Sequence, residues 1–271
     1  MIRPLRAVVL EARLDASPAE VWHALTDAEM LADWFPRTAT AQQGVGGIVE
    51  IAWDGPSWPS TIDVWEPERH LRWANDMPAG PDGQPQPRML IDWFISSENG
   101  QTVLRLVQSG FGPGVEWDGQ IEGTEGGWKY FLWNLEQVLT RHRGRRRHLV
   151  WTRPRVPATR DAFWKAIFDH GLVSVDGEQC TLTLGTISAR GVVAILDPPA
   201  RFAARFPELE HALLFIELEG SKPGFHAGFW LSTYGLAPDR GAALQEALTH
   251  AVQECVRHVT PADTPVEAPT G

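Results

Sequence analysis

Hydrophobic positions recur at helical spacing near the start of the chain and then stop. Val21, Trp22 and Leu25 fall on one helical face, and a second short stretch of this kind ends at Trp34-Phe35-Pro36. Ser17-Pro18-Ala19-Glu20 has the form of a capping box with proline at the first helical position, in which serine and glutamate satisfy two backbone N–H groups. The pattern predicts two short helices separated by a break.

From residue 44 onward the hydrophobic period becomes that of β-strands. Short runs rich in β-branched and aromatic residues cover 46–53, 60–65, 69–73, 88–95 and 102–108. Turn residues between the runs predict an antiparallel meander. Asp92 and Arg105 mark its solvent face. The same alternation places on the inner face Met89, Ile91, Trp93, Ile95, Leu104, Leu106 and Gln108.

A long amphipathic helix is predicted to follow the meander, beginning at Gly126-Gly127-Trp128. Its apolar stripe contains Trp128, Phe131, Leu132, Leu135, Val138 and Leu139. Such a helix is expected to cover the concave face of a curved sheet. The glycine-rich segments 110–114 and 123–127 are expected to form a loop between the last strand and this helix.

The second half of the chain repeats this order of elements. Phe163-Trp164 matches Val21-Trp22 at an offset of 142 residues, and Leu244 matches Trp128 at an offset of 116. The shrinking offset means that the second copy is 26 residues shorter, with the losses between elements. We therefore predict an internal duplication. The alternative is an unrelated α+β domain with a similar order of helix, meander and helix.

Length and composition agree with two domains of unequal character. The chain has 271 residues, about twice a common domain size. Ten of its 13 tryptophans precede residue 140. We expect domains at 1–142 and 156–259, a basic linker at 143–155 and a disordered tail at 260–271. The two domains are expected to pack as an intramolecular pseudo-dimer.

Charge and cysteine content narrow the function classes. The net charge of −10 argues against a nucleic-acid-binding protein driven by its overall charge. Residues 141–155 hold seven basic and no acidic residues, which indicates either a docking strip for an anionic partner or a linker paired with acidic domains. Cys180 and Cys255 form no metal or redox motif and are expected to be reduced structural thiols. With no signal or transmembrane segment, we expect a cytoplasmic protein.

Several motifs of the first half resemble a known family. They are the stretch from Ala16 to Asp27, then Leu31 and Trp34, the stretch from Asp63 to Leu71, Ser109-Gly110-Phe111 and Gly127-Trp128. Together they are similar to the activator-of-heat-shock-ATPase-homologue type of the START-like (SRPBCC) superfamily. The resemblance covers about residues 5–140 well and 150–258 as a degraded copy. It implies an α+β helix-grip fold, in which a curved antiparallel sheet wraps a long C-terminal helix.

The resemblance also implies a cavity for an apolar or aromatic small molecule between the sheet and the helix, and the residues agree with it. Tryptophans on inward positions offer flat apolar walls, each with one N–H that needs a partner, although such residues also fill ordinary cores. Gln108 and Asp63 are candidates to orient a ligand. The predicted lining residues are Trp53, Asp63, Trp73, Ile91, Trp93, Leu106, Gln108, Trp128, Phe131 and Leu135.

The sequence contains no recognisable catalytic signature and predicts no cofactor. His250, Glu254 and His258 share one flank of the predicted last helix, but their spacing lets only two of them reach one metal ion easily. We therefore expect no metal site and no catalytic residues. Besides a binding protein for an apolar small molecule, two alternatives stay open: a protein-interaction module of the co-chaperone kind, and a cyclase- or hydrolase-type enzyme acting on a polyketide-like substrate.

Overall fold

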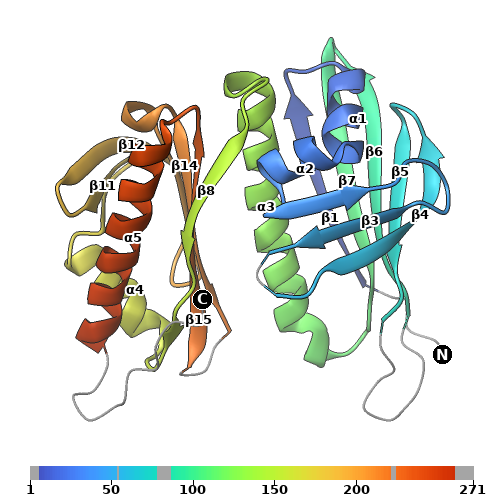
Figure 1. Cartoon of the computed structure of the whole chain (residues 1–271). Helices are drawn as coiled ribbons and strands as arrows, with labels where there is room; N and C mark the ends of the chain where they lie inside the picture. The colour runs from blue at the N-terminus through green and yellow to red at the C-terminus, as the bar shows by residue number, and fades with distance from the viewer. Residues whose placement is uncertain (1–5, 54, 78–86, 221–223, 260–271) are drawn as a thin grey trace. The chain divides into compact units, whose positions relative to one another are not determined.

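The computed structural model describes residues 6–53, 55–77, 87–220 and 224–259, and the expected tail at 260–271 lies outside them. The chain divides into two compact units, residues 1–144 and 145–271, and each is described by itself (Figure 1). Both units combine helices with an antiparallel sheet, so the fold class is α+β and is consistent with a helix-grip fold. No helix among the described residues is long and apolar enough to span a membrane.

The first unit contains a seven-stranded sheet in the order β1-β7-β6-β5-β4-β3-β2. The first strand therefore pairs with the last, and the remaining strands follow as a meander, as predicted. The short edge strand β2 was not predicted. The strands are β1 (Arg6–Leu14), β2 (Thr38–Ala41), β3 (Ile48–Ala52), β4 (Trp58–Glu66), β5 (His70–Asn75), β6 (Met89–Glu98) and β7 (Gln101–Phe111).

Two short helices, α1 (Pro18–Thr26) and α2 (Ala28–Trp34), connect β1 to β2, which confirms the prediction. The capping box is present, with the Ser17 hydroxyl accepting from the Glu20 N–H and the Glu20 carboxylate accepting from the Ser17 N–H. Asp27 ends α1 and caps α2 by accepting from the Met30 N–H at 2.9 Å. These caps satisfy backbone groups that each helix end would leave unpaired.

Strand register decides which side chains share the inner face of this sheet. Trp73 lies opposite Ile91, Ile91 opposite Gln108, and Trp93 opposite Leu106. Asp92 belongs to the outer face, but the expectation that it is solvated was wrong. Its carboxylate is buried, and it accepts hydrogen bonds from Arg72 Nε and pairs with His70 Nε2, each at 2.7 Å. Burial of this carboxylate is tolerated because cross-strand neighbours pair with it.

The long helix α3 (Asp118–Arg141) closes the first unit and begins eight residues earlier than predicted, after a short 3₁₀ turn, η1 (Val115–Trp117). The glycine-rich segment 123–127, expected to be a loop, is therefore helical. A helix interior disfavours glycine by only about 1 kcal/mol per residue, so packing of the rest of the helix outweighs it. Figure 1 shows α3 beside the sheet of this unit.

The second unit contains an eight-stranded sheet whose main path is β10-β11-β12-β13-β14-β15-β8, while β9 pairs with β15. The first strand of this unit again pairs with the last. The seven strands of the main path therefore follow the same order as the seven strands of the first unit, and β9 is additional. The strands are β8 (Arg147–Thr152), β9 (Arg155–Val156), β10 (Val173–Asp176), β11 (Gln179–Leu184), β12 (Ile187–Asp197), β13 (Arg201–Phe206), β14 (Ala212–Glu219) and β15 (Phe225–Tyr234).

The prediction of a linker at 143–155 is wrong for most of that range, because β8 lies within the range and β9 begins in it. Val150 of β8 is fully buried in the core of the second unit. Arginines of this segment pair with nearby acidic residues, as in the bidentate contact of Arg153 with Glu219. The basic stretch is therefore an integral part of a sheet.

Two helices complete the second unit, α4 (Arg160–Asp169) and α5 (Pro238–Val259), with a 3₁₀ turn, η2 (Pro207–Leu209), between β13 and β14. Thr159 caps α4 by accepting from the Ala162 N–H, the role that Ser17 has for α1. The buried stripe of α5 contains Leu244, Leu248, Val252 and Cys255. Among the described residues, the fully buried members of this core are aliphatic residues, phenylalanines and the two cysteines, without a tryptophan.

Candidate functional site

Trp93, on the inner face of β6, lies at the centre of an aromatic cluster in the first unit. Its ring is edge-to-face with three other indoles, those of Trp34, Trp73 and Trp128, at centroid distances of 6.1, 5.7 and 5.2 Å. These four rings come from α2, β5, β6 and α3. The cluster therefore lies where the sheet, α2 and α3 meet.

The cluster continues outward through Phe35, which follows α2. Its ring lies 4.8 Å from those of both Trp128 and Phe131 and 5.5 Å from that of Trp53. Trp53 and Phe131 are themselves 5.0 Å apart and remain partly exposed. The cluster thus has a buried centre around Trp93 and an accessible rim around Trp53 and Phe131.

The hydrogen bonds of the four central indoles differ. Trp34 Nε1 donates to the backbone oxygen of Ala24 at 2.9 Å, and Trp128 Nε1 donates to Gln108 Oε1 at 2.5 Å. In contrast, Trp73 Nε1 and Trp93 Nε1 are buried and have no hydrogen-bond partner among the residues that the structure describes. A buried N–H without an acceptor costs about 1–3 kcal/mol, so these two groups require an explanation.

The structure brings together eight of the ten predicted lining residues in direct ring or hydrogen-bond contact or cross-strand register with one another. These are Trp53, Trp73, Ile91, Trp93, Leu106, Gln108, Trp128 and Phe131. A ninth, Leu135 of α3, is fully buried. Trp34 and Phe35 were not among the predicted lining residues, although the aromatic pair at the end of a predicted helix was a usable signal.

Asp63 differs from the expectation. It lies at an irregularity of the β4–β5 pairing, and its carboxylate accepts a hydrogen bond from Arg88 Nη1 at 2.9 Å. Arg88 also pairs with Asp76. The Asp63 carboxylate is therefore engaged by an arginine, and Gln108 is the predicted polar residue that contacts the cluster.

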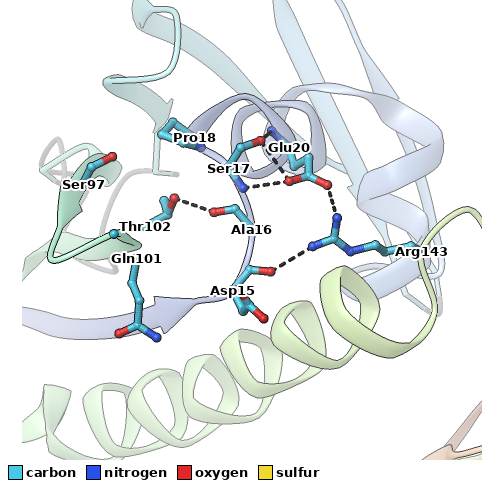
Figure 2. Close-up of a pocket in the computed structure, with 10 residues that line it drawn as sticks. Asp15, Ala16, Ser17, Pro18, Glu20, Ser97, Gln101, Thr102 and Arg143 are labelled. Atoms are coloured by element: carbon cyan, nitrogen blue, oxygen red, sulfur yellow. Dashed lines mark hydrogen bonds and ion pairs between the residues drawn. The ribbon is translucent and has the colours of Figure 1, made fainter.

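A polar groove of about 370 Å³ lies at the start of α1. Figure 2 shows its lining residues, with Arg143 reaching the Glu20 carboxylate and the backbone oxygen of Asp15. Thr102 Oγ1 donates to the backbone oxygen of Ala16 at 2.5 Å. The charges of Glu20 and Arg143 in this groove thus pair with each other.

The Glu20 carboxylate gives this groove a pH-dependent role in stability. Hydrogen bonds from the backbone N–H and then the hydroxyl of Ser17, with the charge of Arg143, hold the pKa of Glu20 below its ordinary value of 4.5. Because the pKa of Glu20 is lowered in the folded state, its ionised carboxylate stabilises the folded protein above pH 4.5. This stabilisation is lost as the pH falls through the pKa of the folded state.

We expect Glu20→Gln to destabilise the first unit at neutral pH by less than about 1 kcal/mol, because the ion pair is solvent-exposed. The difference from the parent protein should shrink in urea titrations as the pH falls below 4.5. Glu50→Gln on β3 controls for the change in net charge. A difference that stays constant from neutral to acidic pH would contradict the assignment.

Chemistry at the aromatic cluster is limited by its polar groups. They are indole N–H groups and one carboxamide, none of which is an acid or a base at neutral pH. Among the described residues, no group of three or more His, Cys, Asp or Glu is placed to hold a metal ion. His258 instead stacks on His170 at 3.7 Å. The polar groups of the aromatic cluster are suited to hydrogen bonding with a bound molecule.

Comparison with known proteins bears on the first unit. Residues 15–140 match the model of the family described as activator of Hsp90 ATPase homolog 1-like protein. This match supports the family resemblance for that part of the chain and does not extend to the second unit. No curated protein matches the chain.

Solved structures are similar to the chain as follows. Protein MLL2253 from Mesorhizobium loti is 26% identical over 51% of this chain and 99% of its own, with a TM-score of 0.45. The Aha1 dimer from Colwellia psychrerythraea is 17% identical over the same shares, also at 0.45. DynU16, a putative protein in the dynemicin biosynthetic locus, is 17% identical over 95% of this chain and 100% of its own, at 0.44.

Proposed function

We propose that the first unit binds an apolar or aromatic small molecule between its sheet and α3. The observation that carries the proposal is the pair of buried indole N–H groups of Trp73 and Trp93, for which the described part of the chain supplies no hydrogen-bond acceptor. Such groups are stabilised when a bound molecule or an internal water supplies an acceptor. The binding residues are those of the aromatic cluster, with Ile91, Leu106 and Leu135 as apolar walls.

The partly exposed rim gives this proposal a route of access. Trp53, Phe131, Ile91 and Gln108 are all intermediate in exposure, whereas Trp73 and Trp93 are fully buried. A ligand entering at the rim would replace contacts among aromatic rings by equivalent contacts with itself. Aromatic walls with few polar groups are the usual lining of small-molecule sites.

We assign a structural role to the second unit and propose that it arose by duplication of the first. The matching strand order and the equivalent caps at Ser17 and Thr159 support common descent. Its buried core of aliphatic residues and phenylalanines contrasts with the indole-rich interior of the first unit. The ligand-binding capacity would then reside in one copy, within a cytoplasmic protein.

Two measurements on the full chain test the binding function. Native mass spectrometry of freshly purified protein should show a co-purified molecule, and calorimetry should show binding of the aromatic hydrocarbon fluorene at one site. Ile91→Trp fills the space beside Trp73 and Gln108 and should lower the affinity for fluorene at least tenfold. Phe94→Trp, on the outer face of the same strand, is the matched control and should bind as the parent does.

Absence of both a co-purified molecule and fluorene binding would contradict the proposal. Unchanged binding to the Ile91→Trp variant would show that fluorene occupies another place, and it would also contradict the assignment. A filled interior with no ligand would favour the protein-interaction alternative.

A further inference from the structure

The buried polar side-chain atoms of the aromatic cluster that lack a partner among the described residues are both hydrogen-bond donors. The indole nitrogen of tryptophan donates one hydrogen bond and accepts none. Trp73 Nε1 and Trp93 Nε1 are buried, lie on neighbouring strands, and find no acceptor within 6–53, 55–77, 87–220 and 224–259. Their rings are 5.7 Å apart. Two neighbouring rings at the centre of the cluster therefore each carry a donor that needs an acceptor.

Gln108 adds a third donor, and its orientation is set by chemistry. Trp128 Nε1 contacts one end of the Gln108 carboxamide at 2.5 Å, and an indole donor requires that end to be the oxygen. The NH₂ group of Gln108 must then occupy the other end. Among the described residues, the contact with Trp128 is the single hydrogen bond recorded for this side chain.

Acceptors that would balance these donors are engaged elsewhere. The Asp63 carboxylate binds Arg88, and the Asn75 side-chain oxygen accepts from Ser60 Oγ at 3.1 Å. Asp92 lies on the outer face with Arg72 and His70. A ligand that brings hydrogen-bond donors into the cluster would leave both its own groups and the indole N–H groups unsatisfied.

We propose that the ligand of this site is a flat aromatic molecule that carries an acceptor oxygen, such as an aryl ketone. This inference rests on the proposed binding function and adds the chemical class. Flat rings match the edge-to-face indoles, and a carbonyl oxygen has two lone pairs, enough for two N–H donors. A pure hydrocarbon binds less well because it leaves the indole N–H donors of the site unpaired. A ring that carries an N–H binds less well because it places a donor opposite these donors.

Three tricyclic probes of nearly the same shape test this inference on the full chain by calorimetry. Fluorenone presents a carbonyl oxygen, fluorene a methylene group and carbazole an N–H at the corresponding position. We expect fluorenone to bind about tenfold more tightly than fluorene, and carbazole to bind most weakly, since one net hydrogen bond corresponds to about a tenfold change in affinity.

Variants identify the donors. Trp73→Phe and Trp93→Phe each keep an aromatic ring and remove the N–H, and at least one of them should abolish the preference for fluorenone over fluorene. Trp58→Phe is the matched control from outside the cluster, because it removes an indole N–H at a position on β4 that is 63% exposed. That variant should keep the preference.

The outcomes separate the two proposals. Equal affinity for all three probes would overturn the ligand class and leave the binding function standing. No binding of any probe, together with no co-purified molecule, would overturn the binding function itself. A preference that survives in both Trp73→Phe and Trp93→Phe, or that Trp58→Phe also removes, would overturn the assignment of the donors. The comparison of probes on the parent protein holds even if a variant fails to fold.

Discussion

Truncation of Trp93 to Ala is expected to destabilise the first unit by about 3–5 kcal/mol. The side chain is fully buried and touches three other indoles, so its removal leaves a cavity that neighbouring rings cannot fill. Because strands on either side of β6 hold Trp73 and Leu106 in register, the backbone has little freedom to collapse into the space.

Hydrogen exchange with mass spectrometry across a urea titration measures this effect separately for peptides of residues 1–144. This matters because a chain with two compact units need not unfold in one transition. Trp58→Ala removes the same side chain from a position that is 63% exposed, and it should change stability by less than about 0.5 kcal/mol. A cost below about 1 kcal/mol for Trp93→Ala would contradict the buried cluster.

The second large effect concerns the thiols of the second unit. Burial raises the pKa of Cys180 and of Cys255 to about 11, from an ordinary value of 9.0. At about pH 8 the thiolate fraction is then lower by about 100-fold. We expect both thiols of the folded protein to react with an aromatic disulfide reagent at least 100-fold more slowly than in urea.

The same shifts predict how stability varies at alkaline pH. A raised folded-state pKa keeps its full stabilising contribution below the unfolded value near 9 and loses it as the pH rises toward 11. Cys180→Ser and Cys255→Ser, each leaving one thiol, assign the two reaction phases. A thiol that reacts in buffer as fast as in urea would contradict its place in the core.

Sequence predicted those parts of the fold whose signals are local. The capping box at Ser17 and Glu20 identifies the start of α1 because both partners lie within four residues. Turn residues and alternation identify the strands of the first meander. By contrast, β2 is built from small residues, Thr38-Ala39-Thr40-Ala41, and carries little β-strand signal of its own.

The two errors in element boundaries have a common cause, which is that long-range packing outweighs local preference. Glycines at 123 and 127 disfavour a helix, yet α3 continues through them because the helix packs along β1. Arginines around 143–147 indicated a linker, yet β8 pairs with β15, some 80 residues later. Neither partner is visible from the neighbouring sequence.

The site was predictable in part for the same reason. Alternation along β6 and β7 placed Trp93, Leu106 and Gln108 on the inner face, and the register confirms it. Which indoles would be hydrogen-bonded was not predictable. Trp34 finds the Ala24 carbonyl within its own helix pair, whereas Trp73 and Trp93 project from strands whose backbone groups are already paired.

The crowding of indole rings around Trp93 has an optical consequence. Indole rings held in a fixed arrangement at centroid distances of 5.2–6.1 Å couple their electronic transitions, and the fixed geometry makes that coupling chiral. The near-ultraviolet circular dichroism of the protein should therefore contain a coupled contribution from these four side chains. Any molecule that moves between these rings alters the coupled bands, so the protein carries its own label-free reporter.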